Sequence, residues 1–176
     1  MSLVALLGLF WIWQSAAAAA TTGGLAPSPR EGFPAPDFTL PSLQGDQVTL
    51  FALRGQVVII NLWTSWCPPC REEMPAIEQI YGQYRDRGLE VLAVNSTFQD
   101  DESAAATFVK ELGLTFPVLL DRDGAVSRRY QLQALPTTFF VDRRGVIHDV
   151  VLGGPMDSVL IESKVLELLG ETAREE

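Results

Sequence analysis

Two cysteines separated by two residues are the part of this sequence best suited to chemistry. Cys67 and Cys70 are the only cysteines among the 176 residues, and Pro68 and Pro69 stand between them. Thiols at this spacing can alternate between a dithiol and a disulfide, and the thiolate pKa sets how readily they react. The pair therefore predicts thiol–disulfide exchange.

The segments on either side of the pair must position the two sulfur atoms. The apolar run 57–62 predicts a strand buried on both faces, and apolar residues three and four apart predict a helix from about Cys70 to Tyr84. Cys67 would then lie at the helix N-terminus, where free N–H groups and the helix dipole favour its thiolate. Cys70, one turn later, should be more buried and less reactive. Cys67 is thus the predicted attacking thiol and Cys70 the resolving one.

The two prolines between the cysteines should influence the redox potential. Pro68 and Pro69 carry no backbone N–H, so they remove two donors from the surroundings of the thiolate and stiffen the loop. Fewer donors stabilise the thiolate less. This favours a moderate or reducing potential over a strongly oxidising one.

A second proline stands at the entrance to an apolar strand. Pro136 follows Leu135 and precedes the run 137–141. A proline cannot donate to a sheet ladder, so its position there must be special. With the cysteine pair upstream, we expect a cis peptide bond that lies against the pair. The main chain of Leu135 would then remain free to pair with a substrate strand.

The remaining pattern predicts an α/β domain over residues 37–170, followed by a polar tail at 171–176. Segments 37–40 and 47–50 predict an N-terminal β-hairpin. Further strands are expected at 89–95, 116–120, 137–141 and 146–152, and helices at 101–112, 125–130 and 158–169. This order predicts a central mixed sheet with helices on both faces.

The N-terminal residues 1–22 form a separate segment. An unbroken apolar run at 3–13 is followed by five alanines at 16–20, and no charged residue occurs before Arg30. This is typical of either a signal peptide or a membrane anchor, and both place the rest of the chain outside the cytoplasm. Residues 23–36, rich in Gly, Pro and Ser, predict a linker. The net charge of -9 argues against nucleic-acid binding.

Other uses of a cysteine pair are poorly supported by the composition. Zinc needs two more ligands, and no other cysteine exists. A copper-delivery site would want a nearby histidine, and His148 is the one candidate. A purely structural disulfide would gain little from closing so short a loop. We therefore predict no metal and no cofactor other than the Cys67–Cys70 disulfide.

Several motifs together resemble the TlpA/ResA-like thioredoxins, which are membrane-tethered bacterial proteins with a thioredoxin-like fold. They are the run Trp66 to Cys70, the helix proline Pro75, the stretch 135–139, and the segments 35–40, 55–63 and 116–121. The resemblance spans about residues 34–169. It implies that Cys67 is the nucleophile, Cys70 the resolving thiol and Pro136 the cis-proline, with Trp66 and Leu135 supporting the site.

The same resemblance implies an extracytoplasmic thiol–disulfide oxidoreductase. Such proteins often reduce disulfides in exported proteins, such as apocytochrome c, with electrons from a membrane thiol carrier of the CcdA/DsbD type. Relatives also carry a buried acid just after the strand that corresponds to 91–95. Here the acids that follow are Asp100, Asp101 and Glu102, which either tune the cysteines or cap the next helix.

Three other functions remain open at this point. A peroxidase of the peroxiredoxin (AhpC/TSA) type shares this fold, and Thr64 and Cys67 have the spacing of its site, but Ile60 stands where its proline is expected. A disulfide-donating oxidase would use the same cysteines in the opposite direction. A binding or chaperone role would hold a client or metal and leave the cysteines incidental.

Overall fold

The computed structural model describes residues 24–170 of the chain. The predicted signal peptide or anchor at 1–22 and the polar tail at 171–176 lie outside the described residues. No helix within 24–170 is long and apolar enough to cross a membrane.

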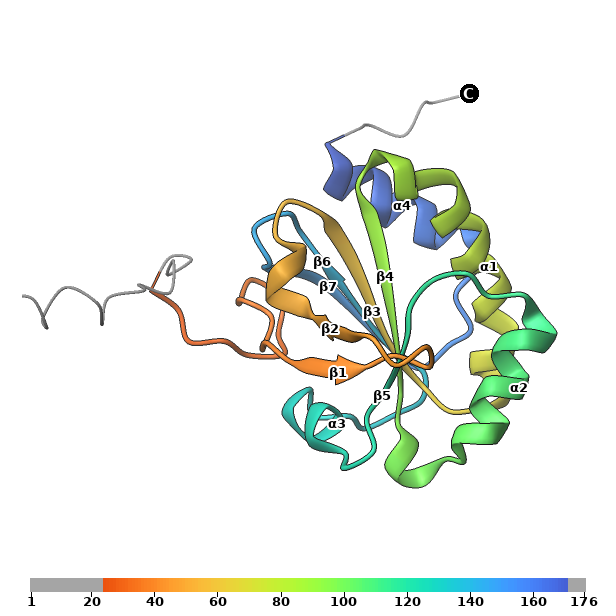
Figure 1. The fold of residues 1–176 in the computed structure, drawn as a ribbon. Helices are drawn as coiled ribbons and strands as arrows, with labels where there is room; N and C mark the ends of the chain where they lie inside the picture. The colour runs from red at the N-terminus through yellow and green to blue at the C-terminus, as the bar shows by residue number, and fades with distance from the viewer. Residues whose placement is uncertain (1–23, 171–176) are drawn as a thin grey trace, which may run out of the picture.

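A five-stranded mixed sheet forms the centre of the molecule (Figure 1). Its strand order is β5-β4-β3-β6-β7. The central strand β3 (Val57–Trp63) pairs in parallel with β4 (Leu89–Asn95), which pairs in parallel with β5 (Val118–Leu120). On its other side β3 pairs antiparallel with β6 (Thr137–Val141), and β6 with β7 (Ile147–Leu152). The predicted mixed sheet is confirmed.

Helices cover both faces of this sheet because β3 is apolar on both sides. All seven of its residues are buried. Val57, Ile59 and Trp63 face a core shared with α1 (Pro68–Tyr84), α2 (Glu102–Leu112) and α4 (Ser158–Leu169). The alternate residues Val58, Ile60 and Leu62 face the core with α3 (Ala125–Arg129) and the N-terminal hairpin. A strand with two buried faces needs such cover on each side.

The predicted N-terminal hairpin forms a separate small sheet. Strand β1 (Thr39–Pro41) pairs antiparallel with β2 (Gln47–Thr49), and a 3-10 turn at Leu50–Leu53 follows. Further 3-10 turns occur at Arg85–Arg87, which extends α1, and at Thr97–Gln99, between β4 and α2. The hairpin lies on the same side of the large sheet as α3 (Figure 1).

The ends of some elements differ from the prediction by one or two residues. Helix α1 begins at Pro68, ahead of the expected start near Cys70, because a proline is tolerated in the first turn. The helix continues through Pro75, which is exposed, so water can reach the carbonyl that lacks a donor. Strand β5 starts at Val118, two residues later than expected.

Much of the predicted linker at 23–36 is attached to the domain. The Gly32 N–H donates to the Ile147 carbonyl (2.8 Å), and the Ile147 N–H donates to the Phe33 carbonyl (2.9 Å). The Ala35 N–H donates to the Gly145 carbonyl (2.9 Å). Strand β7 is an edge strand, and its main-chain groups at this end find their partners in this segment. The folded unit therefore begins before residue 37.

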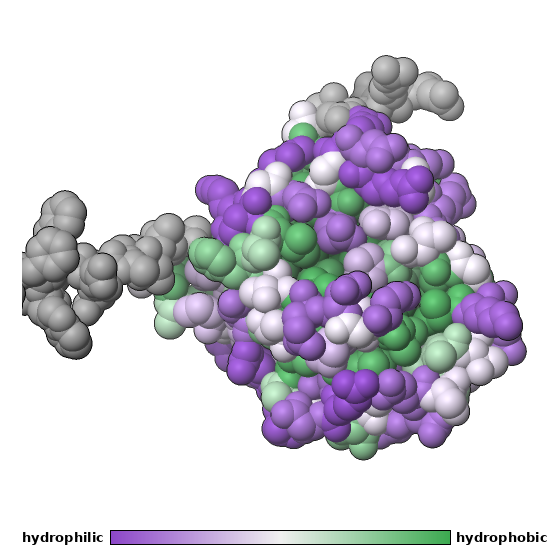
Figure 2. Space-filling model, in the orientation of Figure 1, coloured by the Kyte–Doolittle hydropathy of each residue, from purple (hydrophilic) through white to green (hydrophobic). Residues whose placement is uncertain are grey.

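Polar and charged residues cover much of the surface, and apolar residues show between them toward the middle of the face in Figure 2. The exposed large apolar side chains include Trp66, Phe98 and Leu152. Trp66 and Phe98 line the groove of the site described next, and Leu152 lines a second pocket.

Candidate active site

The cysteine pair lies where β3 passes into α1. A disulfide joins Cys67 and Cys70, whose Cα atoms are 5.3 Å apart. Cys67 is the N-cap of α1, and its Sγ accepts a hydrogen bond from the Cys70 N–H at 3.2 Å. The first N–H groups of a helix have no partner within the helix, so this contact stabilises negative charge on Cys67 once the disulfide is open.

The two cysteines differ little in exposure. Cys67 is 3% exposed and Cys70 is fully buried, so the order is as expected although both sulfurs are largely covered. Pro68 and Pro69 occupy the first two helical positions, where the missing N–H groups cost little. Cys67, unlike Cys70, also lines an open groove, so it is the sulfur that a partner can approach.

The loop before β6 lies against this region. The Leu135–Pro136 peptide bond is cis, as the sequence predicted. The Pro136 carbonyl accepts a hydrogen bond from the Gly153 N–H at 2.8 Å. Within residues 24–170 the main chain of Leu135 makes no hydrogen bond, so its N–H and C=O are available to a bound chain.

Gly154 is closely confined behind this loop. A Cβ atom at this position would lie 2.8 Å from Glu73 Oε2 and 2.9 Å from Pro136 Cγ. Both distances are shorter than a Cβ atom tolerates in a packed interior. The contact shows that Glu73, Gly154 and Pro136 meet at one point. Only glycine fits there without moving the acid or the proline.

A buried acid that the sequence analysis missed lies on α1. Glu73 is fully buried and lies three residues after Cys70, on the same face of the helix. Its Oε1 accepts from Asn61 Nδ2 at 2.7 Å, and its Oε2 accepts from the Met156 N–H at 3.3 Å. Asn61 Nδ2 also donates to Thr138 Oγ1 at 2.8 Å.

Burial raises the pKa of Glu73 from 4.5 to about 7, against the opposing effect of the hydrogen bonds from Met156 and Asn61. The acid therefore changes charge near neutral pH beside the resolving cysteine. An ionised Glu73 opposes a Cys70 thiolate, whereas a protonated one is a proton donor. The sequence indicated the burial of Glu73 in one way: at helical spacing it shares a face with Cys70, Met74 and Ile77.

The three acids singled out after β4 have other roles. Asp101 is the N-cap of α2, where its Oδ1 accepts from the Ala104 N–H at 2.9 Å, so the capping interpretation is confirmed for it. Glu102 pairs with Arg122 at 2.9 Å on the surface. Neither interaction involves a cysteine.

Asp100 holds the loop that leads into the cysteine pair. Its Oδ2 accepts from the Ser65 N–H at 2.6 Å and from Asn95 Nδ2 at 2.7 Å, and its Oδ1 accepts from Ser65 Oγ at 2.6 Å. Burial alone would raise the pKa of Asp100, but these hydrogen bonds lower it below its ordinary value. Asp100 therefore positions Ser65 and, through it, the start of the site.

An open groove runs beside Cys67. Its volume is about 770 Å³. Trp66 lies along it with 58% of its surface exposed, and its Nε1 donates to the Gln99 carbonyl at 3.0 Å. The groove contains no acidic residue, although the chain as a whole is acidic. It is lined by Trp66, Cys67, Pro68, Pro69, Phe98, Gln99, Ser127, Arg128, Gln131, Leu132, Gln133, Ala134 and Leu135.

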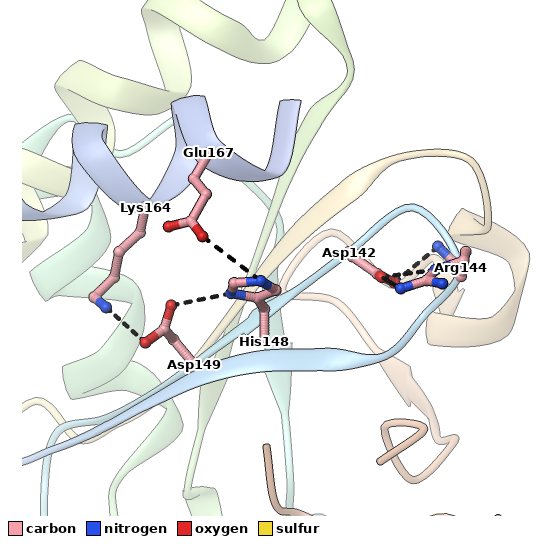
Figure 3. A network of polar contacts seen from close by, with 6 residues as sticks. All are labelled: Asp142, Arg144, His148, Asp149, Lys164 and Glu167. Atoms are coloured by element: carbon pink, nitrogen blue, oxygen red, sulfur yellow. Dashed lines mark hydrogen bonds and ion pairs between the residues drawn. The ribbon is translucent and has the colours of Figure 1, made fainter. Parts of the chain in front are cut away.

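His148, the candidate for copper delivery, belongs to a different part of the molecule. It lies near the start of β7, between Asp149 (3.4 Å) and Glu167 (3.7 Å), and Lys164 Nζ is 2.7 Å from Asp149 (Figure 3). In the described part of the chain, no group of potential metal ligands joins His148 to a cysteine. These contacts tie β7 to α4.

Comparisons with known proteins agree with this geometry. The model of the AhpC/TSA family matches residues 32–150. The chain is 41% identical to the thioredoxin-like protein YneN of Bacillus subtilis over 125 residues, which cover 70% of this chain and 72% of YneN. It is 36% identical over 143 residues to the thiol-disulfide oxidoreductase ResA of the same organism, covering 81% and 79% of the two chains.

This chain belongs to the ResA-like thiol–disulfide oxidoreductases. Its structure is also similar to that of a thiol:disulfide interchange protein, DsbE, from Chlorobium tepidum, with a TM-score of 0.74 and 34% identity, covering 80% of this chain and 99% of the other. The fold is therefore thioredoxin-like. Membership of this enzyme family makes Cys67 and Cys70, the only cysteines in the sequence, the candidates for the reacting pair.

Proposed function

We propose that this enzyme works outside the cytoplasm and reduces disulfides in exported proteins, with apocytochrome c as the leading client. The observation that carries the proposal is the position of Cys67, at the N-cap of α1 and on the wall of an open groove, with Cys70 bonded to it. A reductant needs one thiolate that a client disulfide can reach and a second thiol close behind it.

The reaction transfers two electrons to the client. The Cys67 thiolate attacks one sulfur of the client disulfide, so the client S–S bond breaks, a Cys67–client disulfide forms, and the other client sulfur leaves as a thiolate that takes a proton. Cys70 then loses its proton and attacks Cys67 Sγ. The Cys67–Cys70 disulfide forms and the second client thiol is released.

Two further groups support these steps. The free main chain of Leu135 would pair with the client strand, which orients the client sulfur against Cys67. Glu73, close behind Cys70, would accept the proton that Cys70 releases before its attack, since a carboxyl with a pKa of about 7 is matched to that task. Trp66 would cover one flank of the bound client.

The setting follows from the N-terminal segment and the family. An apolar segment at 1–22 would export the domain and either be removed or hold it at the membrane. A membrane thiol carrier of the CcdA/DsbD type would then restore the dithiol. No cofactor beyond the cysteine pair is needed, because both electrons come from the two sulfur atoms.

Trapping the intermediate tests the proposal. The Cys70→Ser variant of the full chain, held in detergent, is mixed with an oxidised peptide that contains a Cys-x-x-Cys-His segment. We expect a covalent Cys67–peptide disulfide to accumulate, visible by mass spectrometry and lost on addition of a thiol. Cys67→Ser serves as the matched control and should trap none. Equal trapping by both variants would refute the assigned order of attack.

The peroxidase alternative has a direct test of its own. Thr64, which would assist a peroxidatic cysteine, is fully buried, and Cys67 has a disulfide partner three residues away. Reduced enzyme mixed with hydrogen peroxide should therefore lose its thiols no faster than a free thiol of similar pKa. Oxidation several orders of magnitude faster would favour the peroxidase instead.

A further inference from the structure

The outer edge of β7 is covered only in part. At its beginning, Ile147 is bonded to Gly32 and Phe33 of the N-terminal segment. Farther along, the Val150 N–H donates to the Glu31 side chain, Oε1, at 3.1 Å. The N-terminal segment thus provides partners for Ile147 and for the Val150 N–H.

The last residue of the strand is left open. Main-chain groups alternate between the two sides of a strand, and the Val150 N–H points to the outer side while the Gly153 N–H bonds inward to Pro136. The N–H and C=O of Leu152 therefore point outward. The side chain of Leu152 is 61% exposed. An open edge of this kind is a template for pairing with another extended chain.

A pocket of about 420 Å³ adjoins this edge. Phe139, Val150 and Leu152 line it from the sheet, and Pro29 lines it from the N-terminal segment. Its volume leaves room for a large apolar side chain, such as leucine or phenylalanine, against Phe139, Val150 and Leu152. Arg30 and Glu31 also line the pocket, so a positive and a negative charge lie at its edge. We therefore expect little preference for clients of one charge.

The pocket adjoins the groove at Cys67. Gln131 and Gln133 line both. Gln131 is the one residue other than glycine with a left-handed backbone among residues 24–170, at a φ of 52°. This conformation is costly for a residue with a Cβ atom. The side chain of Gln131 is exposed and lines both depressions, so its amide can bond to the main chain of a passing peptide.

We propose that the client binds as an extended chain that reaches from Cys67 across Gln131 and Gln133 to the open edge of β7. There its main chain pairs with Leu152, and one apolar side chain enters the pocket beside Phe139. This inference rests on the proposed function. It specifies the substrate class as unfolded or extended segments that carry a large apolar residue near the disulfide, rather than disulfides held in compact folded proteins.

Two variants of Leu152 test this surface without touching the cysteines. Leu152→Pro removes the outward N–H, and a proline is tolerated where that N–H faces solvent. Leu152→Glu keeps the N–H and places a charge at the pocket. The matched control is Leu160→Glu, which changes an exposed leucine on α4, 42% exposed. All are studied as the full chain in detergent, with circular dichroism to check folding.

The substrates are an oxidised 12-residue peptide with a leucine near its disulfide and, for comparison, oxidised glutathione. We expect KM for the peptide to rise roughly three- to tenfold in each Leu152 variant, as for the loss of one hydrogen bond or one apolar contact. The peptide kcat, the rate with glutathione disulfide and the reduction potential should stay unchanged. Leu160→Glu should match the wild type.

Other outcomes overturn the inference in distinguishable ways. Unchanged peptide KM in the folded Leu152 variants would show that clients do not use this edge. A wild-type dimer that both Leu152 variants abolish would assign the edge to a second copy of the chain. Failure of the wild type to reduce either substrate would instead refute the proposed function itself.

Discussion

Replacing Glu73 by glutamine should change how the stability of the enzyme depends on pH. The folded state raises the pKa of this acid from 4.5 to about 7, so it binds the proton more tightly than the unfolded chain does. The contribution of the protonated acid is fully present below pH 4.5 and is lost as the pH rises through about 7. Stability should therefore fall across this window.

The size of the effect follows from the difference between the two pKa values. A shift from 4.5 to about 7, at about 1.4 kcal/mol for each pKa unit, corresponds to about 3 kcal/mol. The Glu73→Gln variant has no proton to lose at this position. Its side chain still accepts from Asn61, but its amide nitrogen would face the Met156 N–H. The variant therefore loses unfolding free energy by an amount that does not vary with pH.

Guanidinium unfolding of the oxidised chain at pH 4 and at pH 8.5 measures this difference. Between the two pH values the wild type should lose about 3 kcal/mol more unfolding free energy than Glu73→Gln does. Glu72→Gln, at the exposed neighbouring position, is the control and should follow the wild type. Parallel pH profiles for wild type and Glu73→Gln would refute the claim that burial raises this pKa.

Three further changes probe the parts of the site separately. Asp100→Asn should lower the unfolding free energy by about 1–3 kcal/mol in thermal or chemical melts, because an amide nitrogen replaces one oxygen that accepts from partly buried donors; a cost no larger than that of the exposed control Asp86→Asn would contradict its positioning role. Gly154→Ala should destabilise by about 1–3 kcal/mol through overpacking, whereas Gly82→Ala, with open space around it, should be neutral or stabilising; equal effects would contradict the tight contact. Cys70→Ser should abolish multiple turnover in a peptide-reduction assay, and sustained turnover would show that resolution does not need it.

The sequence carried enough information for the fold and the position of the cysteine pair. Residues 57–62 form a strand because a continuous apolar run suits a strand with two buried faces, and the helix follows because apolar residues recur at its period. The cis peptide at Pro136 was predictable because a proline that enters a strand needs an explanation. These features depend on neighbouring residues in the sequence, so they can be predicted without the tertiary structure.

Features that depend on tertiary contacts escaped the prediction. Glu73 shares a helix face with Cys70, Met74 and Ile77, but the sequence does not show that Gly154 and the amide of Asn61 pack against its carboxyl. Residues 28–36 have the composition of a linker, yet the edge of β7 gives their main chain partners. The composition of this segment does not show that it will form hydrogen bonds with a strand edge.

The reduction potential of the Cys67–Cys70 pair tests the central proposal most directly. The enzyme is equilibrated in buffers of graded thiol and disulfide, and the fraction of free cysteine is counted by alkylation and mass spectrometry. A reductant fed by a membrane thiol carrier should have a potential near that of thioredoxin, about -270 mV, or slightly higher. A potential near about -120 mV, typical of a strong oxidant, would contradict the proposal and indicate disulfide donation.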